Sequence, residues 1–309
     1  MESTTSLSAR KSDFGRAVLS TLATRFNAFL CGMAFLLLLL DVWLGRAVDL
    51  HGLSAFLSNW PAMVLIVACA IYCITRPLPR LTDACICIFW GMVLSNLLSP
   101  LILIAGRSPR PLVDWQLYAV DRWFHFSTAA VVHFAAGVPL FRSVLAWSYP
   151  VPGPLVIVAL LAPPIFGKAA ASRQFLLAAA FCATLTAALF AWLPAAGPWT
   201  TEHYPPSAEQ ARVTAYLQEL KSTGPVAADA NNTAIVSFPS FHVALALVTA
   251  VALGSLRPLR IPVWIVTGMV CVSTLTTGWH YAIDLVGGLA VAVASVLASR
   301  RLEPRLQAR

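Results

Sequence analysis

The sequence is poor in charged residues. Asp, Glu, Lys and Arg make up only 11% of its 309 residues, whereas 59% of the residues are hydrophobic. A soluble domain carries roughly 25% charged residues, so this composition excludes a water-soluble globule and indicates a chain that buries most of its surface in lipid. We therefore expect an all-α, polytopic membrane helix bundle, because a membrane helix satisfies its backbone hydrogen bonds internally.

Two other features are missing from the sequence. Its net charge of +8 is spread over short stretches and both ends of the chain, without the basic cluster that nucleic-acid binding needs. The seven cysteines all lie in apolar stretches, and none of their spacings fits a metal site or a disulfide framework. We expect no nucleic-acid partner, and we interpret the cysteines as small core residues.

Long apolar runs are what the sequence does have. They predict eight membrane spans near residues 27–45, 60–75, 84–105, 150–167, 175–193, 240–256, 261–277 and 281–299. Segment 112–146 is also apolar, but it is interrupted by Asp114, Asp121, Arg122, His125 and His133. This segment is either a ninth span or an interfacial or re-entrant helix.

The basic residues favour eight spans. With eight spans and a cytoplasmic N-terminus, one side of the membrane collects 14 of the 21 lysines and arginines: Arg10, Lys11, Arg16, Arg25, Arg76, Arg80, Lys168, Arg173, Arg257, Arg260, Arg300, Arg301, Arg305 and Arg309. Nine spans would place basic clusters on both sides, against the excess of basic residues in cytoplasmic loops. Segment 112–146 then lies at the outer surface, and both chain ends are cytoplasmic.

This topology predicts a domain organisation. It comprises a cytoplasmic tail (1–26), two extra N-terminal spans (27–83), a six-span core (84–299) and a basic cytoplasmic tail (300–309). The first apolar run is too long for a signal-peptide core, so we expect it to be retained. The core includes a long outer loop, 195–236, with a short helix expected at Ser207–Lys221. Such long loops are uncommon unless they act at a site, for example by covering it.

Two histidine motifs stand where apolar runs begin. SFPSFH covers Ser237–His242, and TGWHYAID covers Thr277–Asp284. Between them the chain has an apolar run, a basic break and a second apolar run, which is the pattern of a membrane hairpin. A hairpin returns the chain to the side that it left, so we expect both histidines at one membrane face. Polar residues paired in this way indicate a functional site.

The residue types in these motifs suit phosphoryl transfer. His280 and Asp284 are four residues apart, which predicts that they share one face of a helix, where the carboxylate can orient a nucleophilic or basic imidazole. Pro239 is suited to open a second helix, with Ser240 and His242 in its first turn. The free N–H groups of such a turn attract anions, and phosphate is the obvious candidate.

Other interpretations of these residues stay open. The pair of His280 and Asp284 could be an ion pair that stabilises a helix. A zinc site made by His242, His280 and Asp284 lacks the usual helical H-x-x-x-H spacing, so we expect neither a metal nor a cofactor. We interpret the remaining histidines as interfacial or packing residues: His51, His125, His133 and His203.

The two motifs resemble those of the type 2 phosphatidic acid phosphatase superfamily, which includes lipid phosphatases and vanadium haloperoxidases. In its common form the second motif reads PSGH and the third reads S-R-x5-H-x3-D. The second motif is matched by Pro239, Ser240 and His242, and the third by Ser273, His280 and Asp284. The resemblance covers residues from about 84 to 299 and implies a six-span core with two extra spans before it.

The chain departs from this family at three basic positions. Thr274 stands at the arginine of the third motif. The first motif, K-x6-RP, should end the span before the second motif, but Leu193–Trp199 contains no basic residue. Arg110 and Pro111 imitate its ending two spans too early, with Leu103 at the lysine position.

The same departures resemble the branch of inositol phosphorylceramide synthases and, more distantly, of sphingomyelin synthases. This branch has FPSxH followed by a TxxHYxxD-like motif without that arginine. The latter is fitted by Thr277, His280, Tyr281 and Asp284, and the run DWQLYAVD from Asp114 is similar to an Asp-Gln-Leu run ahead of the core.

The resemblance implies a metal-independent phosphatase or phosphotransferase of phosphorylated lipids. His280 would attack phosphorus to form a phosphohistidine, and Asp284 would orient it. His242 would protonate the departing oxygen, and Ser240 would help to hold the phosphate. Water as the acceptor gives a phosphatase, whereas a lipid or polyol hydroxyl gives a transferase.

A non-catalytic lipid-binding or transport protein on the same scaffold is the alternative function. The missing basic residues favour it. The retained histidines and Asp284 argue against it, as does the scarcity of polar residues within the spans. The composition, rich in Ala, Leu and Arg, indicates a bacterial inner membrane, with the site facing the periplasm.

Overall fold

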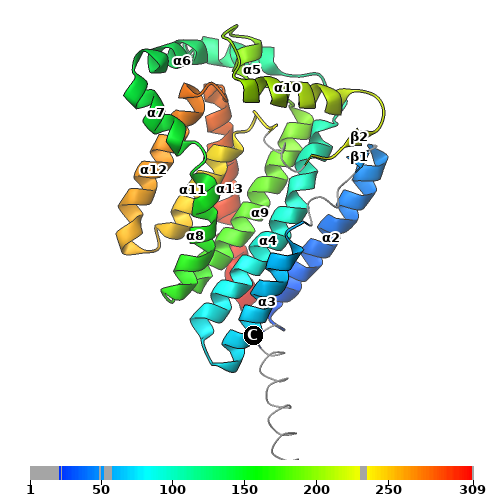
Figure 1. The fold of residues 1–309 in the computed structure, drawn as a ribbon, viewed down its shortest axis with the longest axis vertical. Coiled ribbons are helices and arrows are strands. Elements are labelled where there is room, and N and C mark those ends of the chain that lie inside the picture. The colour runs from blue at the N-terminus through cyan, green and yellow to red at the C-terminus, as the bar shows by residue number, and fades with distance from the viewer. Residues whose placement is uncertain (1–20, 22, 49, 52–57, 230–234, 308–309) are drawn as a thin grey trace, which may run out of the picture.

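The computed structural model describes residues 21, 23–48, 50–51, 58–229 and 235–307. Long helices form a bundle (Figure 1): α2 (Arg25–Ala47), α3 (Trp60–Thr75), α4 (Pro79–Gly106), α8 (Pro152–Ile165), α9 (Ala169–Trp192), α11 (Phe241–Leu253), α12 (Arg257–Thr276) and α13 (Ala282–Gln307). Shorter elements gather around one end of it: β1 (Leu50–His51), α5 (Asp114–Trp123), α6 (Thr128–Gly137), α7 (Pro139–Ser148), the 3-10 helix η2 (Pro198–Thr200), α10 (Ala208–Lys221) and β2 (Val226–Ala227). Most of the expected tail, 1–26, lies outside the described residues.

Every apolar run that predicts a span forms a helix, which confirms the all-α polytopic bundle. Among the described residues, five helices are long and apolar enough to cross a membrane: α2, α4, α9, α12 and α13. The helices α3, α8 and α11 are apolar but shorter. Prolines and glycines limit the last two, because α8 begins at Pro152 and α11 follows Pro239 and is capped by Gly254. Of the eight helices expected to span the membrane, three are therefore shorter than a full span.

Segment 112–146 forms three short helices rather than one straight span. α5 and α6 lie across the end of the bundle, and α7 runs down beside α12 (Figure 1). α6 and α7 meet at a bend of 119°, so together they are a broken span or a re-entrant segment. α5 exposes Trp115 and Trp123, side chains of the type that lies in the headgroup layer. A straight ninth span is excluded by this geometry.

α13 continues to Gln307, so most of the expected basic tail, 300–309, is helical, and its place on the cytoplasmic side stays a prediction. Glu303 is buried, and its Oε1 accepts a hydrogen bond from Nε of Arg173 on α9 at 3.0 Å. This ion pair fastens the last turns of α13 to the bundle. An apolar run shows where a helix meets lipid but not where the helix ends, since polar residues can extend it.

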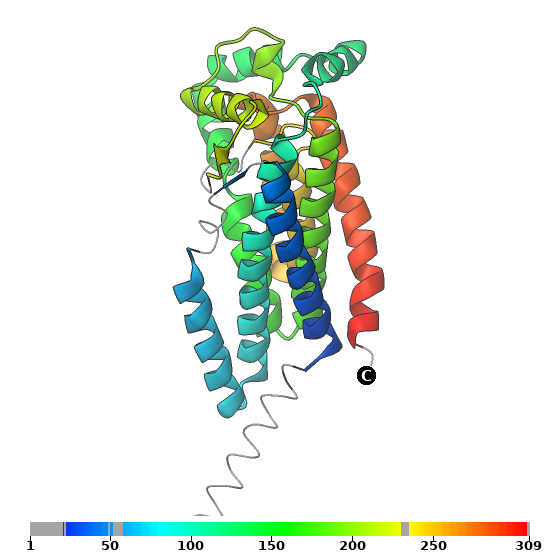
Figure 2. The same cartoon turned by 90° about the vertical axis from the view of Figure 1, so that its right-hand side faces the viewer.

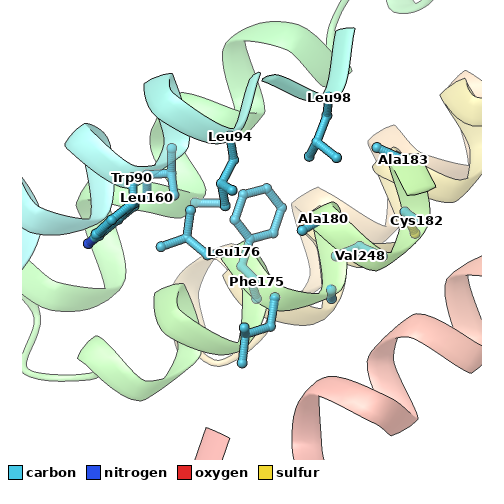
Figure 3. Packing of buried hydrophobic residues seen from close by; sticks show 14 of the residues in the cluster. Trp90, Leu94, Leu98, Leu160, Phe175, Leu176, Ala180, Cys182, Ala183 and Val248 are labelled. Carbon is cyan, nitrogen blue, oxygen red and sulfur yellow. The ribbon is translucent and has the colours of Figure 1, made fainter. Parts of the chain in front are cut away.

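The core of the bundle lies between α4, α8, α9 and α11. Its buried side chains include Trp90, Leu94, Leu98, Leu160, Phe175 and Leu176 (Figure 3). α9 contributes small residues such as Ala180 and Ala183, which let neighbouring helices approach closely. The indole N–H of Trp90 donates to Oδ1 of Asn27 at 3.0 Å, which joins α2 to this core.

The N-terminal helices attach to the bundle at two places. α3 stands at its edge against α4 (Figure 2), where Asn59 and Asn96 exchange side-chain hydrogen bonds of 3.1 and 2.8 Å. β1, which follows α2, pairs in parallel with β2 of the outer loop. The extra helices are thus held by the bundle and by loop 195–236, while the division of the chain at residue 83 stays a prediction.

Candidate active site

The two histidine motifs meet at the end of the bundle that the short helices cover. The ring centroids of His242 and His280 lie 6.3 Å apart. The backbone N–H of Ser240 donates to the carbonyl of Asp284 at 3.0 Å. Gly288 permits this close approach of α13, because a Cβ there would lie 2.5 Å from the Ser240 carbonyl oxygen. Both histidines therefore lie at one end of the bundle, as the hairpin pattern predicts.

His280 and Asp284 do not share a helix face, so that part of the prediction is wrong. α13 begins at Ala282, two residues after the histidine. Asp284 instead reaches back from the third helical position and accepts a hydrogen bond from the Tyr281 backbone N–H at 2.9 Å, as in one half of a capping box. The same carboxylate oxygen, Oδ2, lies 3.2 Å from Nδ1 of His280. Capping geometry therefore brings the pair together.

The surroundings of His280 fix its tautomer. Nδ1 lies 3.0 Å from the carbonyl oxygen of Ser237, which can only accept a hydrogen bond. The proton must therefore be on Nδ1, and Nε2 keeps its lone pair. Burial lowers the pKa of His280 from 6.5 to about 4, so the ring is neutral near pH 7. The hydroxyl of Ser237 donates to Asp284 at 2.9 Å and holds the carboxylate in place.

His242 is held by stacking rather than by hydrogen bonds. Its ring lies 4.3 Å from that of Tyr149, centroid to centroid, at an interplanar angle of 24°. Trp279, the neighbour of His280, lies nearly parallel to Tyr149 at 6.2 Å. Within the described part of the chain, the ring nitrogens of His242 have no hydrogen-bond partner. They remain available to a substrate.

The first turn of α11 offers two backbone donors beside His242. The Ser240 hydroxyl caps this helix by accepting from the Val243 N–H at 3.4 Å. Among the described residues, the N–H groups of Phe241 and His242 have no partner. Free amides at a helix N-terminus attract anions. The Ser240 hydroxyl is fully buried in this cap. Its expected contact with a phosphate stays a prediction.

Asp121 holds the start of α13 from the neighbouring α5. Its two carboxylate oxygens accept from the N–H groups of Ala282 and Ile283 at 2.7 and 3.0 Å. Burial raises the pKa of Asp121, and these hydrogen bonds act in the opposite direction. The carboxylate thereby fixes the turn that carries His280. The sequence shows Asp121 only as a polar interruption of segment 112–146.

Asp114 and Tyr281 form a second support next to this turn. Asp114 accepts from the N–H groups of Ala196 and Gly197 at 3.0 and 2.8 Å. The hydroxyl of Tyr281, a fully buried residue, donates to Asp114 at 3.2 Å. One acidic residue therefore joins α5, the outer loop and the residue after His280. The sequence signals for Asp114 are its place at the start of an amphipathic helix and the DWQLYAVD run that it opens.

The outer loop binds the TGWH turn from outside. The Tyr204 hydroxyl donates to the Gly278 carbonyl at 2.6 Å, and the side-chain amide of Gln210 donates to the same oxygen at 3.0 Å. Gly278 has φ +73°, and a Cβ there would lie 2.7 Å from the Tyr204 hydroxyl. These contacts hold the TGWH turn, and the covering of a site by loop 195–236 stays a prediction.

A family model described as the PAP2 superfamily matches residues 115–298. The chain belongs to the PAP2 superfamily. No curated protein and no solved structure matches it. The matched region contains both histidine motifs and begins within α5, so α4 lies outside it. Membership supports a membrane-embedded phosphoesterase of the phosphatase type that acts on lipids.

This PAP2 superfamily member lacks basic side chains where the common motifs place them. Thr274 is fully buried, and its hydroxyl donates to the Cys271 carbonyl at 2.7 Å. Leu103 is fully buried in the core, while Arg110 lies over the ring of Trp192 at 5.9 Å. Within the described residues, no lysine or arginine forms a hydrogen bond or ion pair with the catalytic candidates. The helix N-terminus is the electropositive element that the site does have.

The remaining histidines and acids do not add to the site. The side chains of His125, His133 and His203 are exposed, and that of His51 lies outside the described residues. Among the described residues, no group of three or more His, Cys, Asp or Glu side chains is arranged to hold a metal ion, so the zinc alternative has no ligand set there.

Replacing Asp121 by asparagine is expected to lower the free energy of unfolding by about 1–3 kcal/mol, because one partly buried N–H of α13 loses its acceptor. The catalytic rate should fall as well, since the His280 turn loosens. Thermal unfolding and turnover of the purified variant check both effects. The matched control is Glu209→Gln, an exposed acid on α10, which should change stability by less than about 0.5 kcal/mol. Equal effects of the two substitutions would contradict the role assigned to Asp121.

Proposed function

We propose that this PAP2 superfamily member is a phosphatase or phosphotransferase of phosphorylated lipids that forms a phosphohistidine on His280. The observation that supports it most strongly is the fixed tautomer of His280, which leaves Nε2 free to attack. The ring of His242, 6.3 Å away, is close enough for both rings to contact one phosphate. The two free amides of α11 supply the donors that would hold that phosphate.

The proposed reaction has two steps. First, the phosphate anion bound beside His242 favours the protonated form of this ring. Nε2 of His280 then attacks phosphorus, the bond between phosphorus and the lipid oxygen breaks, and His242 gives its proton to that oxygen. Second, the neutral His242 takes a proton from the acceptor hydroxyl, whose oxygen attacks phosphorus and releases His280. Asp284, 3.2 Å from Nδ1, stabilises the positive charge that the His280 ring carries between the steps.

The burial of the site favours a hydroxyl acceptor other than water. His280 is 2% exposed, and Tyr281 is fully buried beneath the outer loop. A covered site of this kind limits hydrolysis of a reactive intermediate. We therefore favour a transferase, in keeping with the resemblance of TGWHYAID to inositol phosphorylceramide synthases. A non-catalytic lipid-binding protein remains the alternative, since the missing basic side chains weaken phosphate binding.

The proposed orientation places the histidines outside the cytoplasm. Basic residues gather at the opposite end of the helices: Arg76, Arg80, Lys168, Arg173, Arg257, Arg260, Arg300 and Arg301. Cytoplasmic ends of membrane helices are rich in such residues. In a bacterial inner membrane the site would face the periplasm.

Trapping the intermediate tests this function directly. The purified protein is mixed with phosphatidic acid or phosphatidylinositol that is radiolabelled at phosphorus, and the reaction is stopped within milliseconds. We expect an acid-labile, alkali-stable label on His280 that is lost faster when inositol, glycerol, diacylglycerol or ceramide is added. The exposed His203→Ala variant should be labelled as the unchanged protein is. A protein that binds these lipids but never becomes labelled would be the non-catalytic alternative.

A further inference from the structure

A cavity of about 440 Å³ opens at the end of the bundle opposite to the histidines. It lies between α9, α11, α12 and α13, and its lining includes Gly254 and Ser255 of the α11–α12 turn. Its volume falls within the roughly 300–1,000 Å³ that ligand pockets occupy. The proposed reaction makes no use of this cavity, so its role is separate from catalysis.

The polar side of the cavity is cationic and has unused donors. Arg260 of α12 and Arg300 of α13 both line it. Within the described residues neither guanidinium has a hydrogen-bond or ion-pair partner, in contrast to Arg173, which pairs with Glu303 at the same end. The hydroxyl of Ser255, also in the lining, is buried without a partner among those residues. Together these donors can bind an anion that has several oxygen acceptors.

The other side of the cavity is apolar. Phe175, Val248 and Val296 line it from three different helices. Trp264 stands at its edge with 44% of its surface exposed, which suits a ring at the boundary between lipid tails and headgroups. A small inorganic anion would leave this wall in contact with water, and a neutral lipid would leave both guanidinium groups unpaired.

We propose that this cavity binds one anionic phospholipid from the leaflet at this end of the bundle. The phosphate lies between Arg260 and Arg300, and the first part of an acyl chain lies against the apolar wall. Basic pockets between membrane helices recognise lipid headgroups in this way. Since α11, α12 and α13 all line the cavity, the bound lipid joins the far ends of the helix that carries His242 and of the two helices that flank His280. It should therefore stabilise the bundle as a whole.

Lipid titration of the purified full-length protein in detergent tests this proposal. The probes are phosphatidylglycerol, phosphatidylcholine with the same acyl chains, and soluble glycerol phosphate, with native mass spectrometry and thermal unfolding as the measurements. We expect one tightly held phosphatidylglycerol that raises the unfolding temperature. The R260Q/R300Q double variant should weaken its binding at least tenfold, whereas R257Q/R301Q, which removes the same charge from exposed positions outside the cavity, should change it less than twofold.

A second variant keeps the charge and removes the space. Ala171→Trp, in the first turn of α9, fills the cavity from its lining and should also prevent phosphatidylglycerol from binding. Equal loss in both arginine double variants would overturn the proposal, because the effect would then be diffuse charge. Equal binding of phosphatidylcholine, or full competition by glycerol phosphate, would overturn it as well. None of these outcomes depends on whether His280 is a nucleophile.

Discussion

The purified His280→Ala variant is expected to show no measurable turnover of phosphorylated lipids. The proposed nucleophile is lost, and no other imidazole of the described residues lies beside the free amides of α11 except His242, which has the second role in the proposed reaction. Removing the nucleophile of a catalytic set that acts as a unit costs about 10⁴-fold or more in the catalytic rate. Release of labelled phosphate or of labelled product from a lipid panel measures it.

The His280→Asn variant separates chemistry from folding. Its side-chain amide can donate to the Ser237 carbonyl much as Nδ1 does, so the buried hydrogen bond is kept while the nucleophile is lost. We expect the unfolding temperature of this variant to stay near that of the unchanged protein and its activity to be as low as that of the alanine variant. His133→Ala, on the exposed face of α6, is the control and should keep full activity. Activity within tenfold of normal in His280→Asn would contradict a phosphohistidine.

The bundle and the meeting of the motifs could be predicted because they depend on simple patterns. A run of about 20 apolar residues forms a membrane helix whatever its neighbours are, and a hairpin returns to its starting side. These two rules suffice to bring His242 and His280 to one end. They do not depend on which side chains of the loops meet.

The supports of the site could not be predicted, because they join distant segments. Asp121 caps a helix that starts 161 positions later, and Asp114 binds amides of the outer loop. No local pattern in the sequence pairs these residues. The spacing of His280 and Asp284 also fits two geometries, since positions four apart meet on a helix face and equally across a helix start. Only the place where α13 begins distinguishes them.

The departures from the common motifs have a physical counterpart in the structure. Three of the helix starts near the site already have side-chain partners: Asp121 serves α13, Glu202 serves α6 and Ser207 serves α10. α11 is capped by Ser240, which leaves its first two amides free as Ser207 does in α10, and it differs from α10 because these amides lie beside His242. An anion is thus directed to the helix that carries His242. A helix N-terminus is a weaker source of positive potential than the basic side chains of the common motifs. It therefore favours a substrate that is also bound through its lipid part.

The His242→Ala variant is expected to lose about 10²- to 10⁴-fold in lipid turnover, the range for removal of a general acid. The loss of rate should differ between formation of the phosphohistidine and its release. A lipid alkoxide is a poor leaving group and needs the proton of His242, whereas nitrophenolate leaves without one. With p-nitrophenyl phosphate the variant should therefore form the phosphohistidine at nearly the normal rate. Its release should stay slow, since no base activates the acceptor.

This difference predicts a burst. Rapid mixing of His242→Ala with p-nitrophenyl phosphate should release about one nitrophenolate per protein molecule, followed by a slow phase, and the label should remain on His280. The unchanged protein and the His203→Ala variant should release nitrophenolate without this burst and slow phase. A slow release from the start would contradict the assignment, because it would mean that His242 is needed to bind the phosphate. The Tyr149 ring, stacked on the His242 ring at 4.3 Å, would then position His242 as a phosphate ligand and not as a proton donor.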